Sequence, residues 1–246
     1  MVGAGRVGKA LSDGSTSHST RLANNANQVA GYAHAVSNPR GHKDVPTPPD
    51  CLLLGCGILH KEVEFLIEKN GWQLDTDWLD SSLHVNFEKL AHELQTGILR
   101  NKGRDIVVFY GCCHPRMEKI LETAHTFRTE GQNCVEMLLG REKFMEELGN
   151  GAFFLLEDWA LRWDEAIGKT FGQNPDVVRE IFQLSNKSLL CLRTPCSGDF
   201  EQAAHEVGVK VGLPVRWMDV GLEHLEQVLR QMVERKFGEQ SFLKAK

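Results

Sequence analysis

The sequence predicts an α/β fold, a doubly wound and mostly parallel sheet with helices on both faces. Short apolar runs, such as residues 106–110, do not alternate with polar residues, as expected of strands covered on both faces. Amphipathic helical patterns separate these runs, so strands and helices alternate along the chain. A later unit, LLCLRTPC followed by PVRWMDV, echoes the earlier LLLGC and DTDWLD. The echo is weak, and it leaves open a division into two similar halves.

The first half alternates three strands with three helices. The expected strands are residues 51–54, 73–79 and 106–110. The expected helices contain residues 63–67, 87–98 and 117–123, where apolar side chains recur at helical spacing. Strand, helix, strand, helix, strand, helix is the order of a parallel, doubly wound sheet.

The second half is less regular at its start and then repeats the same unit. A helical pattern covers residues 135–148, and a strand is expected at 152–156. Trp159 and Trp163 are four residues apart, which predicts one helix that packs both rings on the core. Further strands are expected at 188–192 and 215–218, and further helices at 200–207 and 222–233.

We expect one folded region at residues 50–238, divisible into halves 50–150 and 151–238, with a tail at 239–246. Residues 1–49 are rich in Ser, Asn, Gly and His and end in VPTPP, which predicts a disordered leader. The leader contains GAGRVG, which formally matches a dinucleotide-binding fingerprint. That fingerprint requires a preceding strand, and only Met1 and Val2 precede Gly3. We therefore do not assign a nucleotide site there.

Composition and charge indicate an ordinary soluble protein of the cytoplasm. The 246 residues are 41% hydrophobic and 25% charged, with a net charge of −5. The 28 basic residues are scattered, so we expect no nucleic-acid partner. No apolar run approaches the ~20 residues that span a membrane, and we expect neither a membrane segment nor a signal peptide. Seven cysteines, an odd number, predict free or metal-bound thiols in a reducing compartment.

A group of cysteines and one histidine is expected at the carboxyl edge of the sheet. Cys56 and Cys113 directly follow predicted strands, and His84 closes the loop after another. Cys134 opens a helical pattern, where backbone amides stabilise a thiolate. Three sulfurs and one imidazole nitrogen suit tetrahedral Zn²⁺, with iron or an iron–sulfur cluster as the other choice. The alternative is that these thiols are buried structural residues.

Other residues of the same region are expected to be neighbours of such a site. Glu62 lies one turn into the helix after Cys56, where it could act as a catalytic base, orient a ligand or simply be solvated. Asp158 has the same ambiguity. Cys196 follows a strand of the second half and could add a thiol to the same edge. The remaining candidates are more often bystanders or core residues, namely Cys51, His60, His92, Cys112, His114 and Cys191.

Five sequence blocks in order resemble a known family. They are LLLGCGILHKEVEFL, the SSLH turn, VVFYGCCHPRM, GQNCVEMLLGREKF and GAFFLLEDWALRW, and the resemblance covers about residues 51–234. The family is the one called domain of unknown function 1638, whose members look like cytoplasmic α/β proteins. Carried over residue by residue, the resemblance points to Cys56, Glu62, His84, Cys113 and Cys134. It also implies an association with corrinoid-dependent methyltransferase systems. His114 and Asn133 depart from the residues usual at their positions in the family.

The leading functional hypothesis is a cytoplasmic metalloprotein that acts on a small-molecule substrate by thiol or methyl-group transfer. Cys56, Cys113 and Cys134 would bind Zn²⁺ or iron, with His84 or Glu62 completing or supporting the site. A second hypothesis is a non-catalytic protein that carries a small molecule or corrinoid to a partner methyltransferase. A third, weaker hypothesis is a thiol redox protein that uses the adjacent Cys112 and Cys113.

Overall fold

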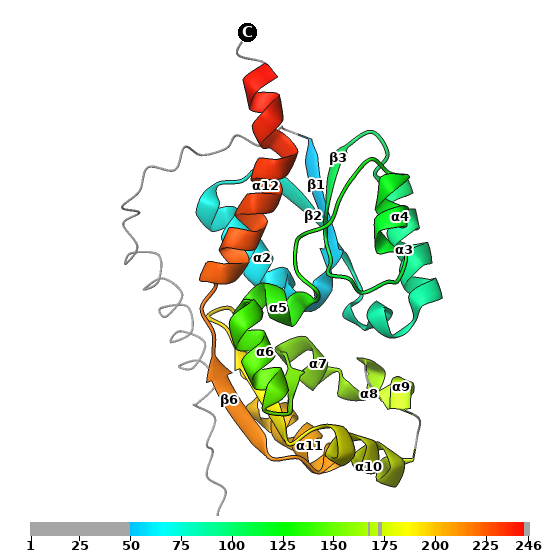
Figure 1. Cartoon of the computed structure of the whole chain (residues 1–246), viewed down its shortest axis with the longest axis vertical. Helices are drawn as coiled ribbons and strands as arrows, with labels where there is room; N and C mark the ends of the chain where they lie inside the picture. Colours follow the sequence, from blue (N-terminus) through cyan, green and yellow to red (C-terminus); the bar gives the residue numbers. More distant parts are fainter. Residues whose placement is uncertain (1–49, 167, 172–173, 244–246) are drawn as a thin grey trace, which may run out of the picture. The chain divides into compact units, whose positions relative to one another are not determined.

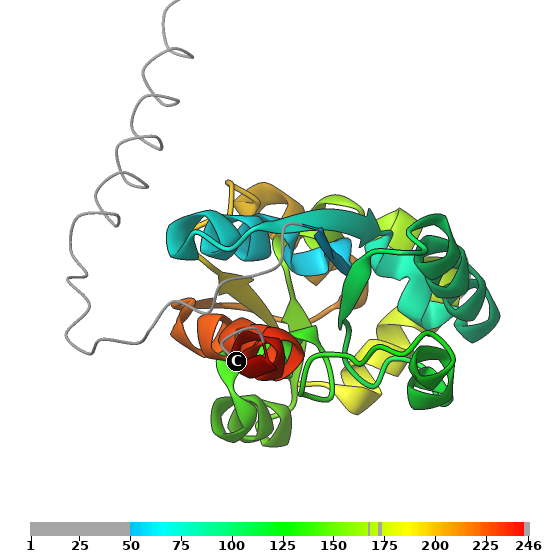
Figure 2. The ribbon, with the colours of Figure 1, turned by 90° about the horizontal axis from the view of Figure 1, so that it is seen from above.

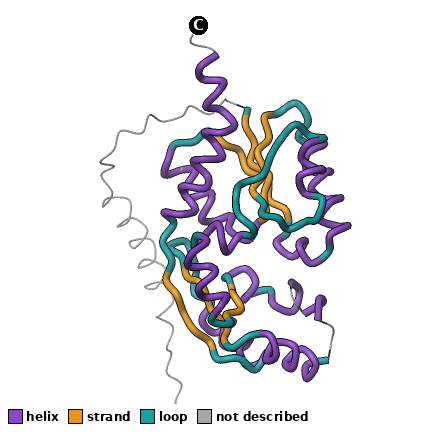
Figure 3. The backbone as a smooth tube through the Cα atoms, in the orientation of Figure 1, coloured by secondary structure: helices purple, strands orange, loops and turns teal. Residues whose placement is uncertain are grey.

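The strands form two separate parallel sheets rather than one. The computed structural model describes residues 50–166, 168–171 and 174–243, and Figures 1 and 3 show the strands in two groups. Each sheet has three strands, in the order β2-β1-β3 and β4-β5-β6. The α/β class and the parallel pairing predicted from the sequence are confirmed. The leader at 1–49, with its GAGRVG segment, and residues 244–246 lie outside the described residues.

The first sheet contains β1 (Cys51–Cys56), β2 (Leu74–Leu79) and β3 (Asp105–Phe109). The central strand β1 is paired in parallel with both neighbours, with Cys56 opposite Leu79 and Gly55 opposite Phe109. Since all three strands run the same way, their carboxyl ends lie at one edge. Residues 127–129 extend the sheet beyond β3, because Val108 bonds to Phe127 and Thr129 through its backbone.

The second sheet contains β4 (Ala152–Leu155), β5 (Ser188–Arg193) and β6 (Val215–Asp219). It too is parallel, with Phe154 opposite Leu190 and Cys191 opposite Trp217. The side chains that follow its carboxyl ends contact those that follow the carboxyl ends of the first sheet. Lys61 pairs with Glu157, and Thr194 bonds to Glu62. The two edges therefore enclose one region.

Helices cover both faces of the first sheet, as Figures 1 and 2 show. Helices α2 (His60–Asn70) and α12 (Glu223–Leu243) lie on one face, and α3 (Phe87–Arg100) and α4 (Met117–Glu122) lie on the other. Alternate strand residues serve the two faces: Leu53 packs in the core with α2 and α12, and Leu52 packs in the core with α3 and α4. This is why the apolar runs of β1 and β3 do not alternate with polar residues.

The core beside α12 is shared by the two sheets. It contains Leu53 of β1, Leu190 of β5 and Leu229 of α12, each fully buried. Two short helices, α5 (Cys134–Leu139) and α6 (Arg141–Gly149), contribute to it. The other face of the second sheet packs on α7 (Glu157–Leu161), α8 (Trp163–Ala166), α10 (Pro175–Ser185) and α11 (Glu201–Val211). A short helix, α9 (Gly168–Phe171), precedes α10 in the chain.

Three helical details differ from the sequence expectation. The pattern at 135–148 forms two helices, because Gly140 has a φ of 79° and interrupts the helical backbone between them. Trp159 and Trp163 lie on separate helices, α7 and α8, because Arg162 leaves helical geometry. Helix α10 was not predicted; Asn174 caps it and Pro175 is its first residue. Among the described helices, none is long and apolar enough to cross a membrane.

Candidate metal centre

Cys56 and Tyr110 lie side by side at the carboxyl ends of β1 and β3. Gly55 is opposite Phe109, so Cys56, the last residue of β1, is next to Tyr110, the residue that follows β3. Cys113 follows three residues later, in the loop before α4, and is partly buried. The expectation that Cys56 and Cys113 emerge at the same edge of the sheet is confirmed.

Gly111 brings the third cysteine to this edge. A Cβ atom at Gly111 would stand 2.3 Å from the Gln132 carbonyl oxygen and 2.7 Å from the Asn133 Cα. The Cys112 amide donates to the same Gln132 carbonyl at 2.7 Å. The backbone of residues 132–133 therefore lies directly on Gly111, and Cys134 begins α5 beside the end of β3. Glycine is needed here because any Cβ would collide with that backbone; the φ of Gly111 is not in the left-handed region, so the requirement is steric and not conformational.

The three thiols are close enough to affect one another. Burial raises the pKa of Cys56 to about 12, and the nearby Cys113 contributes to the rise. Burial also raises the pKa of Cys134 well above its usual value, with Cys56 and Cys113 adding to the effect. The pKa of Cys113 is raised too, mainly by burial. Burial outweighs the expected effect of the helix start on Cys134, so without a metal these thiols are neutral at pH 7.

Tyr110 is the buried polar neighbour of these thiols. Its side chain is 1% exposed, and within the described part of the chain its hydroxyl has no hydrogen-bond partner. Burial raises the pKa of Tyr110, and the adjacent Cys56 and Cys113 raise it further, Cys56 also through contact with the hydroxyl. The Tyr110 hydroxyl therefore lies within reach of the Cys56 sulfur, and a thiolate there would accept its hydrogen bond more strongly than a neutral thiol does.

His84 packs against Trp159. The two rings are 4.9 Å apart between centroids, and His84 Nδ1 donates to the Ser81 carbonyl oxygen at 2.8 Å. Burial lowers the pKa of His84, which favours a neutral imidazole. Within residues 50–166, 168–171 and 174–243, no group of three or more His, Cys, Asp or Glu side chains is already arranged to hold a metal ion.

Glu62 faces the second sheet. It is 6% exposed, and the Thr194 hydroxyl donates to its Oε1 at 2.6 Å. Burial raises the pKa of Glu62, although the hydrogen bond from Thr194 opposes the rise. Cys196 lies near this carboxylate, and burial together with Glu62 raises the pKa of that thiol to about 11. Glu62 and Cys196 therefore form a second polar group, where residues of the two sheets meet.

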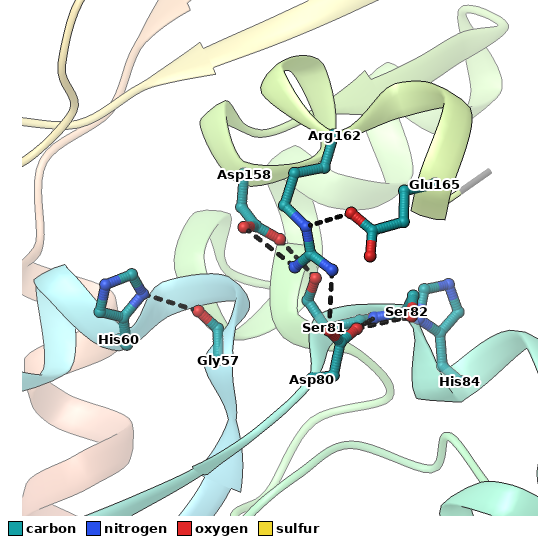
Figure 4. A network of polar contacts seen from close by, with 9 residues as sticks. All are labelled: Gly57, His60, Asp80, Ser81, Ser82, His84, Asp158, Arg162 and Glu165. Atoms are coloured by element: carbon teal, nitrogen blue, oxygen red, sulfur yellow. Dashed lines mark hydrogen bonds and ion pairs between the residues drawn. The ribbon is translucent and has the colours of Figure 1, made fainter. Parts of the chain in front are cut away.

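A network of charged and hydroxyl side chains joins the loop after β2 to α7 (Figure 4). Arg162 donates to Asp80 at 2.7 Å and pairs with Asp158 and Glu165. The Ser81 hydroxyl donates to Asp158, so both carboxylates are held. Burial disfavours the Asp80 charge, but the Ser82 hydroxyl and amide and the Arg162 guanidinium lower the pKa of Asp80 to about 2. Sequence reasoning missed Asp80 and Arg162, because nothing in the chain relates a residue after β2 to one after β4.

A family profile matches residues 78–229, with the description "Protein of unknown function (DUF1638)". The chain belongs to the DUF1638 family. The profile match begins at Trp78 of β2, so it is shorter than the sequence resemblance, which began near residue 51. His84, Cys113 and Cys134 of the candidate site lie within the DUF1638 match, while Cys56 and Glu62 precede it. No significant match was found among curated proteins or solved structures.

The other cysteines and His114 lie in different settings. Cys51 and Cys191 are buried in strands, as expected of core residues. Cys112 is exposed and accepts a hydrogen bond from Arg128 at 3.0 Å. His114 is 6% exposed and packs edge-on against Phe87, with its Nδ1 accepting from the Arg116 amide. None of these four residues is among the neighbours that shift the pKa of Cys56 or Cys134.

Proposed function

We propose that the protein binds Zn²⁺ through Cys56, Cys113 and Cys134 and that it catalyses a transfer reaction on a small thiol or methyl donor. The observation that carries the proposal is that three partly buried thiols from distant parts of the chain meet at one edge, where Cys113 lies near Cys56 and both lie near Cys134. Iron, alone or as a cluster, is the other metal that suits such donors.

The residues present fit a thiolate-bound metal. Three soft sulfur donors are typical of zinc, and the buried Tyr110 hydroxyl lies beside the Cys56 sulfur. Tyr110 could donate to a metal-bound thiolate at Cys56, as the neighbours of metal ligands commonly do. On this proposal, binding draws the sulfurs together, since the described residues hold no preformed metal group. Burial favours the neutral ring of His84, and its Nε2, which is not used in the bond to Ser81, is the candidate fourth ligand.

When bound, zinc lowers the pKa of a coordinated thiol or water and so supplies a nucleophile at neutral pH. The chain's own residues supply the surroundings. Tyr110 and Val135 are buried neighbours in sequence of Gly111 and Cys134, and Glu62 lines a pocket in which it could exchange a proton with a bound molecule. Reduced thiols are required throughout, so we place the protein in a reducing compartment such as the cytoplasm.

Metal analysis of the full chain tests the proposal. Protein purified without oxygen and equilibrated with zinc is expected to retain about one equivalent after gel filtration, because thiolate zinc sites bind tightly. Cys113→Ser is expected to lose this metal. Cys191→Ser is the matched control, because Cys191 is buried in β5 outside the thiol group. Retention of less than about a tenth of an equivalent by the unmodified chain would refute the proposal.

A further inference from the structure

A pocket lies beside the thiol group, between the start of α2 and the start of α7. Its volume is about 190 Å³. Three apolar side chains, Ile58, Leu156 and Leu161, form part of its wall, and Glu62 and Ser197 line it as well. The pocket draws residues from after β1, β4 and β5, so the meeting of the two sheets creates it.

The polar wall of the pocket is a chain of hydrogen bonds. The Thr194 hydroxyl donates to Glu62, accepts from the Cys196 amide at 3.1 Å and lies 3.1 Å from the Ser197 hydroxyl. Ser197 in turn accepts from the Thr194 amide at 3.0 Å. The Thr194 hydroxyl accepts from the Cys196 amide with its oxygen and donates its single proton to Glu62. These bonds fix the Glu62 carboxyl at the pocket wall.

The charges around the pocket are already neutralised. Lys61 contacts both Glu157 oxygens, at 2.8 and 2.9 Å, and Asp158 is held by Ser81 and Arg162. Burial raises the pKa of Glu62, which favours its neutral form. Apart from Glu62, the carboxylates and the lysine that line the pocket are already paired, so a charged ligand would enter at a cost in desolvation.

His60 is a further polar side chain of the wall. Its Nδ1 lies 2.8 Å from the Gly57 carbonyl oxygen, an acceptor, so Nδ1 carries the proton and Nε2 presents a lone pair (Figure 4). The wall thus offers an acceptor at His60 and a carboxyl group at Glu62. A hydroxyl or thiol group, which both donates and accepts, matches the two.

We propose that this pocket binds a small uncharged molecule through its hydroxyl or thiol group. His60 would accept a hydrogen bond from that group, and the Glu62 carboxyl would donate one to it. The pocket adjoins the thiol group, because Asp158, which lines it, also raises the pKa of Cys56 after burial and Cys113. Its role as the substrate pocket rests on the proposed function, whereas the binding itself does not require a metal.

Three thiols of similar size but different charge test the inference: 2-mercaptoethanol, mercaptoacetate and cysteamine. Each is titrated without oxygen into the zinc-free full chain, with the methyl signals of Ile58, Leu156 and Leu161 followed by NMR. Saturable shifts are expected with 2-mercaptoethanol, at a Kd at least about fivefold below those of both charged thiols. Equal or tighter binding of either charged thiol, or no saturable shift with 2-mercaptoethanol, would overturn the proposal.

Two variants locate the binding. Leu161→Trp fills the pocket and is expected to raise the Kd for 2-mercaptoethanol at least about tenfold. Leu161 is 58% exposed, so the substitution leaves the core intact. Leu184→Trp is the control, because Leu184 is 80% exposed on α10, away from the pocket. Unchanged binding in Leu161→Trp would place the ligand elsewhere and overturn the inference.

The metal proposal and the pocket fail separately. If the unmodified chain takes up no zinc but binds 2-mercaptoethanol in the pocket, the pocket stands and the metal centre is refuted. If the chain takes up zinc but the probe causes no saturable shift, the pocket is refuted and the metal centre stands. Cys113→Ser is expected to bind the probe as the unmodified chain does, since Cys113 is absent from the pocket lining.

Discussion

Replacing Thr194 by Val tests whether the contact between the two sheets is as specific as the structure indicates. Val keeps the shape of Thr but removes the hydroxyl that donates to Glu62 at 2.6 Å and accepts from the Cys196 amide. Both Thr194 and Glu62 are almost fully buried, at 5% and 6% exposed. Water therefore cannot easily replace the lost partner of Glu62.

The expected cost follows from that burial. A buried group left without its partner loses about 1–3 kcal/mol, so we expect Thr194→Val to lower the unfolding free energy by about 2 kcal/mol. For a chain of this size the melting temperature should fall by roughly 4–8 °C. Thr194→Ser keeps the hydroxyl and should cost only about 0.8 kcal/mol, for one buried methyl group.

Urea unfolding followed by circular dichroism measures these values. The matched control is Thr123→Val, which removes a hydroxyl bonded to the Ile120 carbonyl oxygen at an exposed position and should change stability by less than about 0.5 kcal/mol. If Thr194→Val costs no more than Thr123→Val, the hydroxyl is not the buried partner of Glu62, and the account of this contact is wrong.

Three further substitutions give clear expectations. Because burial raises the pKa of Glu62, its neutral form stabilises the fold below about pH 4.3 and this contribution is lost as pH rises through the folded pKa. Glu62→Gln should therefore gain stability relative to the unmodified chain between pH 4 and pH 8, and an equal difference at both pH values in urea melts would contradict this. Leu53→Ala, at a fully buried position, should cost about 2–5 kcal/mol, whereas Leu184→Ala at an exposed one should cost less than about 0.5 kcal/mol; similar costs would refute the assigned core. Gly111→Ala should cost about 1–3 kcal/mol and reduce zinc uptake, because its Cβ would collide with the Gln132 carbonyl, while Gly149→Ala, with open space around it, should not; unaltered uptake and stability in Gly111→Ala would show that the approach is not tight.

Much of the fold could be predicted from local patterns. The apolar runs that became β1, β3 and β5 and the amphipathic stretch that became α12 each carry a signal within a few residues. The division into two sheets has no such local signal, because it depends on which strands pair with one another across the chain. Helix α10 could also have been predicted, because Val177, Ile181 and Leu184 recur at helical spacing after an Asn-Pro start.

Only part of the candidate site could be predicted, because some of its contacts follow from the topology of one sheet and others join the two sheets. Cys56 and Cys113 follow strands of one parallel sheet, so topology alone brings them together. The contact of Glu62 with Thr194 and that of Asp80 with Arg162 join the two sheets, and no local pattern encodes such a pairing. The expected low pKa of Cys134 was wrong because burial, which the sequence does not reveal, outweighs the backbone amides.

X-ray absorption at the zinc edge tests the central claim most directly, because it counts the atoms bound to the metal. The zinc-loaded full chain is expected to show about three sulfur atoms at roughly 2.3 Å, with a lighter atom completing the tetrahedron. Cys113→Ser should lose one sulfur or the metal itself. A spectrum with only nitrogen and oxygen neighbours at about 2.0–2.2 Å would contradict a centre built from Cys56, Cys113 and Cys134.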